Sequence, residues 1–96
     1  MPMYILERQF DVTQDGMPAV GRRSRSLIEG QFPEITWHHS HVTLGDDELV
    51  KTFCLYEAPS EDAVRAHAHE LGMHTVVSVY ELVGDVTPAD FPLDQS

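Results

Sequence analysis

The sequence predicts one α+β domain with the element order β-α-β-β-α-β, and three observations indicate it. Four segments of the 96-residue chain are rich in branched and aromatic residues, as strands are. Two segments between them repeat apolar residues every three or four positions, as amphipathic helices do. Gly, Pro or Asp stands at each junction, where turns need them. We therefore expect a ferredoxin-like sandwich, in which two helices cover one face of a four-stranded antiparallel sheet.

The first half of this pattern is a strand at residues 3–10 followed by a helix at 19–32. Asp15-Gly16 supplies the turn between them, and Pro33 ends the helix. The helical repeat consists of Val20, Ser24, Leu27, Ile28 and Phe32. A cluster of basic residues falls on the opposite side, where we expect it to face solvent: Arg22, Arg23 and Arg25.

The centre of the chain predicts an antiparallel hairpin of two strands, at 35–44 and 48–58, joined at Gly45-Asp46-Asp47. Its register stays open between two alternatives. A three-residue loop places His39 opposite Phe53, whereas a four-residue loop places His39 opposite Cys54.

The second helix has clear ends, because Ser60 can cap its start and Gly72 can stop it after Leu71. A valine-rich strand at 75–82 follows. We expect the domain to span residues 1–84, and residues 85–96 to form a tail that has little reason to be ordered unless Phe91 and Leu93 dock.

Composition excludes several classes of function. The formal net charge of −10 argues against nucleic-acid binding, which needs clustered cations. No apolar run approaches the length of a membrane span, and the start of the chain reaches Glu7 and Arg8 too soon for a secretory signal. The single cysteine, Cys54, cannot form an internal disulfide, so we expect a cytoplasmic protein.

The predicted sheet has apolar residues on both faces. In the third strand Phe53 and Leu55 alternate with Cys54 and Tyr56. Such a strand is typical of a sheet that is buried on both sides. Since the helices cover only one face, we expect a homodimer through the open face of the sheet.

All six histidines lie between residues 38 and 74. Strand alternation predicts that His39 and His41 share a face with Trp37, while His38 points away with Ser40 and Val42. His67 lies at the edge of the inner stripe of the second helix, from which it can reach the sheet. Because imidazole suits nickel, copper and zinc, these positions predict a transition-metal site at His39, His41 and His67. The alternative for each is a structural histidine bonded to backbone or carboxylate.

Several motifs together resemble a family of small bacterial proteins, largely described as a domain of unknown function, that includes an actinobacterial nickel-binding member. They are Met1-x-x-Tyr4-x-x-Glu7-Arg8-x-Phe10, Trp37-x-x-Ser40-x-Val42, Thr52-Phe53-Cys54-Leu55-Tyr56-Glu57-Ala58-Pro59, Val64-Arg65-x-His67-Ala68 and Leu71-Gly72. The resemblance implies a ferredoxin-like homodimer and nickel binding in at least one relative. Among the histidines of the chain, His67 is the one that best matches a position of the family, so the resemblance assigns the metal role most readily to it. The chain departs from the family at His41, where an aromatic residue is usual, and in a longer segment at 11–34.

Two classes of function follow. The first is a cytoplasmic protein that binds a divalent transition metal, nickel before zinc or copper, for sequestration or metal response, with no catalytic residues. The alternative is a dimeric α/β-barrel-type enzyme acting on an aromatic or haem-like molecule, with Trp37 and Tyr56 in its pocket and His39 as general base. A partner-binding module with no ligand is a third possibility, carried by the open face or an edge strand.

Overall fold

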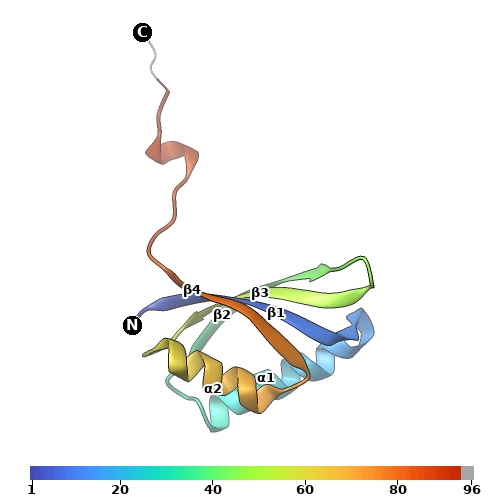
Figure 1. Ribbon diagram of the computed structural model, residues 1–96. Helices are drawn as coiled ribbons and strands as arrows, with labels where there is room; N and C mark the ends of the chain where they lie inside the picture. The colour runs from blue at the N-terminus through green and yellow to red at the C-terminus, as the bar shows by residue number, and fades with distance from the viewer. Residues whose placement is uncertain (94–96) are drawn as a thin grey trace.

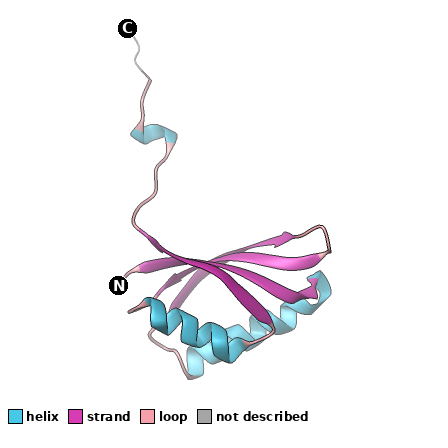
Figure 2. Ribbon diagram, in the orientation of Figure 1, coloured by secondary structure: helices cyan, strands magenta, loops and turns pink. Residues whose placement is uncertain are grey.

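The computed structural model describes residues 1–93, and within them four strands and two α-helices form one α+β sandwich (Figure 1). The strands are β1 (Met3–Thr13), β2 (Thr36–Leu44), β3 (Leu49–Glu57) and β4 (His74–Leu82), and the helices are α1 (Met17–Gly30) and α2 (Glu61–Leu71). The sheet order is β2-β3-β1-β4, with every neighbouring pair antiparallel. Both helices lie on the same face of the sheet (Figure 2). The predicted fold class is therefore confirmed.

The core forms between the helices and the inward side chains of β1 and β3. From Met3 to Phe10 of β1 and throughout β3, half-buried and buried residues alternate strictly, because successive side chains point to opposite faces. The inward set includes Leu6 and Tyr56, which pack with Ile28 of α1 and Val64 of α2. Of the residues in the predicted helical repeat, Val20, Ser24 and Ile28 are buried on α1, whereas Leu27 is half-buried and Phe32 lies beyond the end of the helix.

The bounds of the elements differ most from the prediction at the first helix. β1 continues to Thr13, a short 3-10 turn at Gln14–Gly16 replaces the expected loop, and α1 begins at Met17 with Pro18 in its first turn. The sequence predicts that Arg23 faces solvent, but in the structure its side chain makes two hydrogen bonds to the backbone. Its guanidinium donates to the carbonyls of Leu71 (3.1 Å) and Glu70 (2.9 Å), which satisfies free carbonyls at the end of α2.

The register of the β2–β3 hairpin differs from both predicted alternatives. His39 lies opposite Leu55, and His41 lies opposite Phe53. The reason is that Leu44 pairs with Val50, and the amide of Gly45, just after the strand, donates to the carbonyl of Leu49 at 3.0 Å, so Gly45 is not part of the loop. The turn is then Asp46-Asp47-Glu48, a three-residue loop that places Glu48 at a positive φ of 65°.

A bulge at His38 corrects a second prediction, that of the faces of β2. Trp37 pairs with Tyr56 and His39 pairs with Leu55, so His38 is an extra residue in the strand. The bulge turns Trp37 to the helix side, where its Nε1 donates to Ser40 Oγ at 2.9 Å. His39 and His41 do share a face, as predicted, but Trp37 does not share it.

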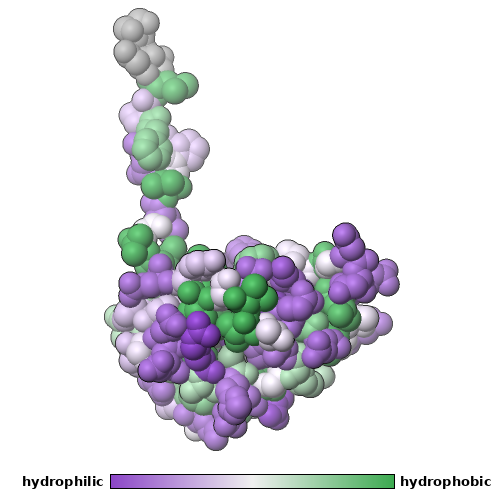
Figure 3. Space-filling view, in the orientation of Figure 1, coloured by the Kyte–Doolittle hydropathy of each residue, from purple (hydrophilic) through white to green (hydrophobic). Residues whose placement is uncertain are grey.

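After β4 the chain leaves the body of the domain. In Figure 1 residues 83–93 run away from the sheet, with one 3-10 turn at Pro88–Asp90. Phe91 is 65% exposed, so it does not dock on the domain. The space-filling view shows a hydrophilic body with a hydrophobic area over β4 and further hydrophobic residues along this tail (Figure 3). Residues 94–96 of the predicted tail lie outside the described residues.

Candidate functional site

The structure divides the three predicted ligands between two places. His39 and His41 stand on the open face of β2, whereas His67 is fully buried between α2 and the sheet. Among residues 1–93, no three His, Cys, Asp or Glu side chains lie close enough together to hold a metal ion. A single copy of the chain therefore brings two of the predicted ligands together and leaves the third apart.

The His39–His41 pair is exposed and preorganised by the strand. The two rings lie 5.0 Å apart between centroids and are inclined at 77°. Alternation along β2 fixes both on one face, and neither ring has a recorded hydrogen-bond partner within the described chain. Neutral imidazole nitrogens so placed can both approach one ion at the usual distance of about 2.0–2.1 Å.

The other histidines have separate surroundings. His38 Nε2 lies 3.3 Å from a carboxylate oxygen of Glu57, and His69 is exposed on α2. His74 Nδ1 lies 2.6 Å from the carbonyl of Gly72, and its ring stacks at 4.8 Å from that of Phe10. Burial lowers the pKa of His74, so this ring is neutral near pH 7. These contacts give His38 and His74 structural partners.

His67 is held in a buried polar cluster. Its Nδ1 lies 3.4 Å from Arg8 Nη2, and its Nε2 lies 3.2 Å from Ser24 Oγ. The rings of Phe32 and Tyr56 pack at 5.7 and 5.8 Å from the imidazole. Burial, aided by the charge of Arg8, lowers the pKa of His67 to about 4. His67 is therefore neutral at pH 7, with both ring nitrogens engaged.

Arg8 is the residue that sequence analysis missed. It is only 2% exposed, and its guanidinium lies 5.2 Å from the centre of the Tyr56 ring. The signal was present in the sequence, since Arg8 has the same parity along β1 as Leu6 and Phe10, whose side chains form the core. A charged residue at an inward position of a strand is uncommon and points to a specific role.

A cavity of about 500 Å³ opens beside this cluster, between α1 and the inner face of β2 and β3. Arg8, Trp37 and Tyr56 are among its lining residues, and so are Ser40, Thr52 and Cys54. Each of these six residues belongs to a motif through which the chain resembles the bacterial family. His39 does not line this cavity, so it is not placed to act as general base there.

Comparison with known proteins supports the same resemblance. The model of a family described as nickel responsive protein SCO4226-like matches residues 4–81. The chain belongs to this family. The match covers all four strands and both helices nearly in full, and therefore both histidine environments described above. A search of curated proteins finds no match.

Two solved structures share the fold of this SCO4226-like chain. The crystal structure of SCO4226 from Streptomyces coelicolor A3(2) aligns with a TM-score of 0.63 and 14% identity, over 86% of this chain and 99% of that one. The solution structure of the C-terminal domain of MgtC from Mycobacterium tuberculosis aligns with a TM-score of 0.57 and 16% identity, over 88% of each chain. At these identities the likeness concerns the fold alone.

Neither helix of the described chain is long and apolar enough to cross a membrane.

Proposed function

We propose that this chain binds a divalent transition metal, nickel first, through His39 and His41 on the open face of the sheet. The observation that carries the proposal is the 5.0 Å separation of the two imidazole rings on one exposed strand. Imidazole is a preferred ligand of nickel, copper and zinc, and the family description names nickel responsiveness. The role is sequestration of the metal or a response to it. The free cysteine, Cys54, agrees with a reducing cytoplasmic setting.

Two imidazoles leave the coordination of such an ion incomplete, and a second copy of the chain supplies the rest in this proposal. The open face beside the pair carries half-buried apolar side chains, among them Ile5, Phe53 and Leu55. The register places Leu55 between Ile5 and His39, so the pair adjoins the apolar part of this face. A homodimer through the open face would bring two histidine pairs near each other and bury that apolar surface.

The first experiment is calorimetric titration of nickel, with zinc for comparison, into metal-stripped protein at pH 7.5, with sedimentation to follow the oligomeric state. We expect binding at micromolar affinity or tighter that is lost at pH 5.5, because a protonated imidazole cannot bind a metal. Replacing His39 and His41 together by Ala removes the site. The matched control replaces His38 and His69, which removes two exposed histidines and leaves binding intact.

A His67→Gln variant tests the three-ligand site that the sequence predicts. If His67 is a ligand, this variant loses affinity as the His39 and His41 variants do. If the pair acts without it, the affinity for nickel stays unchanged. Nickel binding that survives the loss of both His39 and His41 would contradict the proposal.

The cavity favours a second candidate, a function on a small molecule. Its volume of about 500 Å³ falls within the usual range for ligand pockets, and Trp37 and Tyr56 line it as the enzyme alternative predicts. No histidine lines it within the described chain, and burial raises the pKa of Tyr56, so this phenol stays protonated. The lining thus favours binding over acid–base catalysis.

A further inference from the structure

The cavity between α1 and the β2–β3 half of the sheet has mostly apolar walls. They are formed by Phe10, Met17, Val20, Trp37 and Val42. β2 is the edge strand of the sheet, and its residues Trp37 and Val42 line the cavity together with Met17 of α1. This space can take the body of a small apolar molecule.

Arg8 brings a positive charge to the cavity without a counter-charge. Within the described part of the chain, every recorded ion pair of Lys or Arg with a carboxylate involves another residue: Lys51, Arg25 or Arg65. No carboxylate among residues 1–93 forms an ion pair with Arg8. Its Nε is buried and has no hydrogen-bond partner among residues 1–93. A buried cation left in this state is destabilising unless an anion joins it.

The neighbours of Arg8 do not neutralise it. His67 is uncharged and only accepts a hydrogen bond from Nη2, and the Tyr56 ring offers the face of a protonated phenol. The cluster of Arg8, His67 and Tyr56 therefore carries a net charge of one positive unit. It lies next to the cavity, since both Arg8 and Tyr56 line its wall.

Three hydroxyl groups line the cavity together with the guanidinium of Arg8. They belong to Ser24, Ser40 and Thr52. Ser40 Oγ accepts the hydrogen of Trp37 Nε1, so its own hydroxyl hydrogen remains to be donated. A guanidinium with a nearby hydroxyl donor is a common arrangement for holding a carboxylate.

We infer that this cavity binds a small monocarboxylic acid with a compact apolar or aromatic body, its carboxylate on Arg8 and its body against Trp37 and the α1 wall. One cation among apolar walls suits a ligand with a single negative charge. Phosphate would bring a second charge, for which the lining offers no further cation. This inference is independent of the metal proposal, because the histidine pair lies on the other face of β2.

The test uses benzoate as probe, titrated into the full chain at pH 7.5 and followed by calorimetry and by the fluorescence of Trp37, the single tryptophan. Benzamide has the same body without the charge, and inorganic phosphate has charge without the body. We expect saturable benzoate binding at millimolar concentration or below, and binding of benzamide and phosphate weaker by about tenfold or more. Equal binding of benzamide would overturn the role of Arg8, and equal binding of phosphate would overturn the role of the apolar body.

Two glycines of α1 provide a matched pair of variants. A Cβ at either Gly21 or Gly30 would meet no atom within 4 Å, so both tolerate a larger residue. Gly21 lines the cavity and Gly30 does not. Gly21→Phe should abolish benzoate binding by filling the space, whereas Gly30→Phe should leave it unchanged. Arg8→Met should weaken benzoate to the level of benzamide. Benzoate binding that persists in Gly21→Phe, or the absence of any benzoate binding to the parent, would overturn the inference.

Discussion

Arg8 of β1 and His67 of α2 meet in the interior of the domain, where Nη2 of the arginine lies 3.4 Å from Nδ1 of the histidine. A guanidinium can only donate, so Nδ1 must accept and the ring proton must sit on Nε2. That proton points to Ser24 Oγ, which lies 3.2 Å from Nε2. The arrangement therefore fixes one tautomer of a neutral imidazole and ties β1, α1 and α2 together through polar groups.

This burial of His67 predicts a loss of stability in weak acid. The folded protein holds the pKa of His67 at about 4, whereas the unfolded chain has a value near 6.5. Between these two pH values His67 is protonated in the unfolded state and stays neutral in the folded state. The free energy of unfolding therefore falls as the pH drops from about 6.5 to 4. The shift corresponds to about 3 kcal/mol at about 1.4 kcal/mol per pKa unit.

Urea denaturation from pH 7 to pH 4.5 measures this effect, and the His67→Gln variant isolates it. Gln does not titrate, so the difference in free energy of unfolding between parent and variant should narrow as the pH falls. The lowered pKa of His74 acts in the same direction in both proteins and cancels. Parallel curves would show that the imidazole of His67 is not held neutral in the folded state.

The bond from Trp37 Nε1 to Ser40 Oγ predicts the effect of a single hydroxyl. Ser40→Ala leaves the indole nitrogen without its partner at 2.9 Å and should lower the free energy of unfolding by about 1 kcal/mol. It should also shift the fluorescence of Trp37, the single tryptophan. Ser78→Ala is the control, because Ser78 is on β4 and has no recorded side-chain hydrogen bond. Equal effects of the two substitutions would contradict the role of the bond.

Two positions with positive φ predict opposite responses to substitution. Glu48 closes the hairpin at a φ of 65°, a conformation that favours glycine, so Glu48→Gly should raise the free energy of unfolding by about 1 kcal/mol. Gly72 ends α2 at φ 67° and ψ −168°, a region nearly closed to other residues. Gly72→Ala should therefore lower stability by about 1–3 kcal/mol. Thermal unfolding of both variants and the parent tests whether Glu48→Gly raises the stability and Gly72→Ala lowers it.

Local sequence patterns were sufficient to predict the order of the strands and helices and the two ends of α2. Ser60 does cap this helix, because its hydroxyl accepts from the amide of Ala63 at 3.2 Å, and Gly72 does end it. The bounds at Glu61 and Leu71 follow from those two residues. The inward position of Arg8 could also have been deduced from the alternation of β1.

The faces of β2 could not be deduced in this way. Alternation alone places Trp37 with His39, and only the bulge at His38 reverses that arrangement. The bulge reflects the packing of Trp37 near Tyr56, with ring centroids 6.4 Å apart, against the helices. Such a contact depends on the assembled core and leaves no local pattern. For the same reason the sequence could not show that His67 and the His39–His41 pair lie on opposite sides of the sheet.

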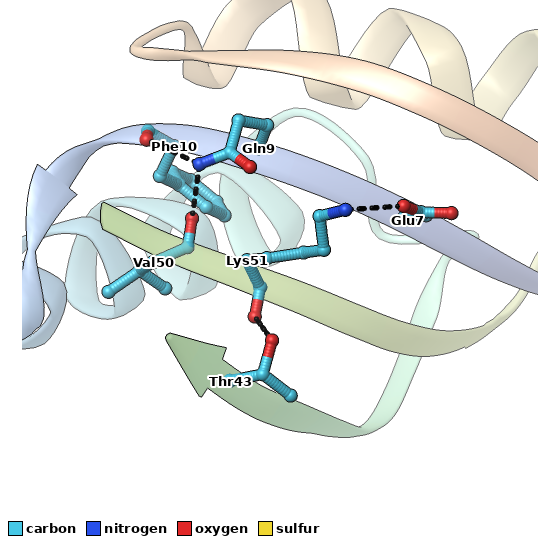
Figure 4. Close-up of polar contacts among 6 residues, drawn as sticks. All are labelled: Glu7, Gln9, Phe10, Thr43, Val50 and Lys51. Atoms are coloured by element: carbon cyan, nitrogen blue, oxygen red, sulfur yellow. Dashed lines mark hydrogen bonds and ion pairs between the residues drawn. The ribbon is translucent and has the colours of Figure 1, made fainter. Parts of the chain in front are cut away.

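The open face itself combines a polar and an apolar part. Figure 4 shows the polar part, where Lys51 Nζ lies 2.9 Å from Glu7 Oε2 and Gln9 Nε2 donates to the carbonyl of Val50 at 3.3 Å. These contacts link β3 to β1 and satisfy the charged groups within one chain. The neighbouring apolar residues, Phe53 and Leu55, have no helix over them and adjoin His39 and His41 in the register.

A charge placed in this apolar part should therefore separate the proposed dimer and weaken the metal site together. Leu55→Lys puts an ammonium group next to His39 and opposite Ile5, where burial against a second copy would leave it unpaired. We expect sedimentation to report a monomer and nickel affinity to fall, while circular dichroism stays unchanged. Ala66→Lys adds the same charge at an exposed position of α2 and should leave both measurements as in the parent. If Leu55→Lys binds nickel as tightly as Ala66→Lys does, one chain completes the site alone and the second copy contributes no ligand.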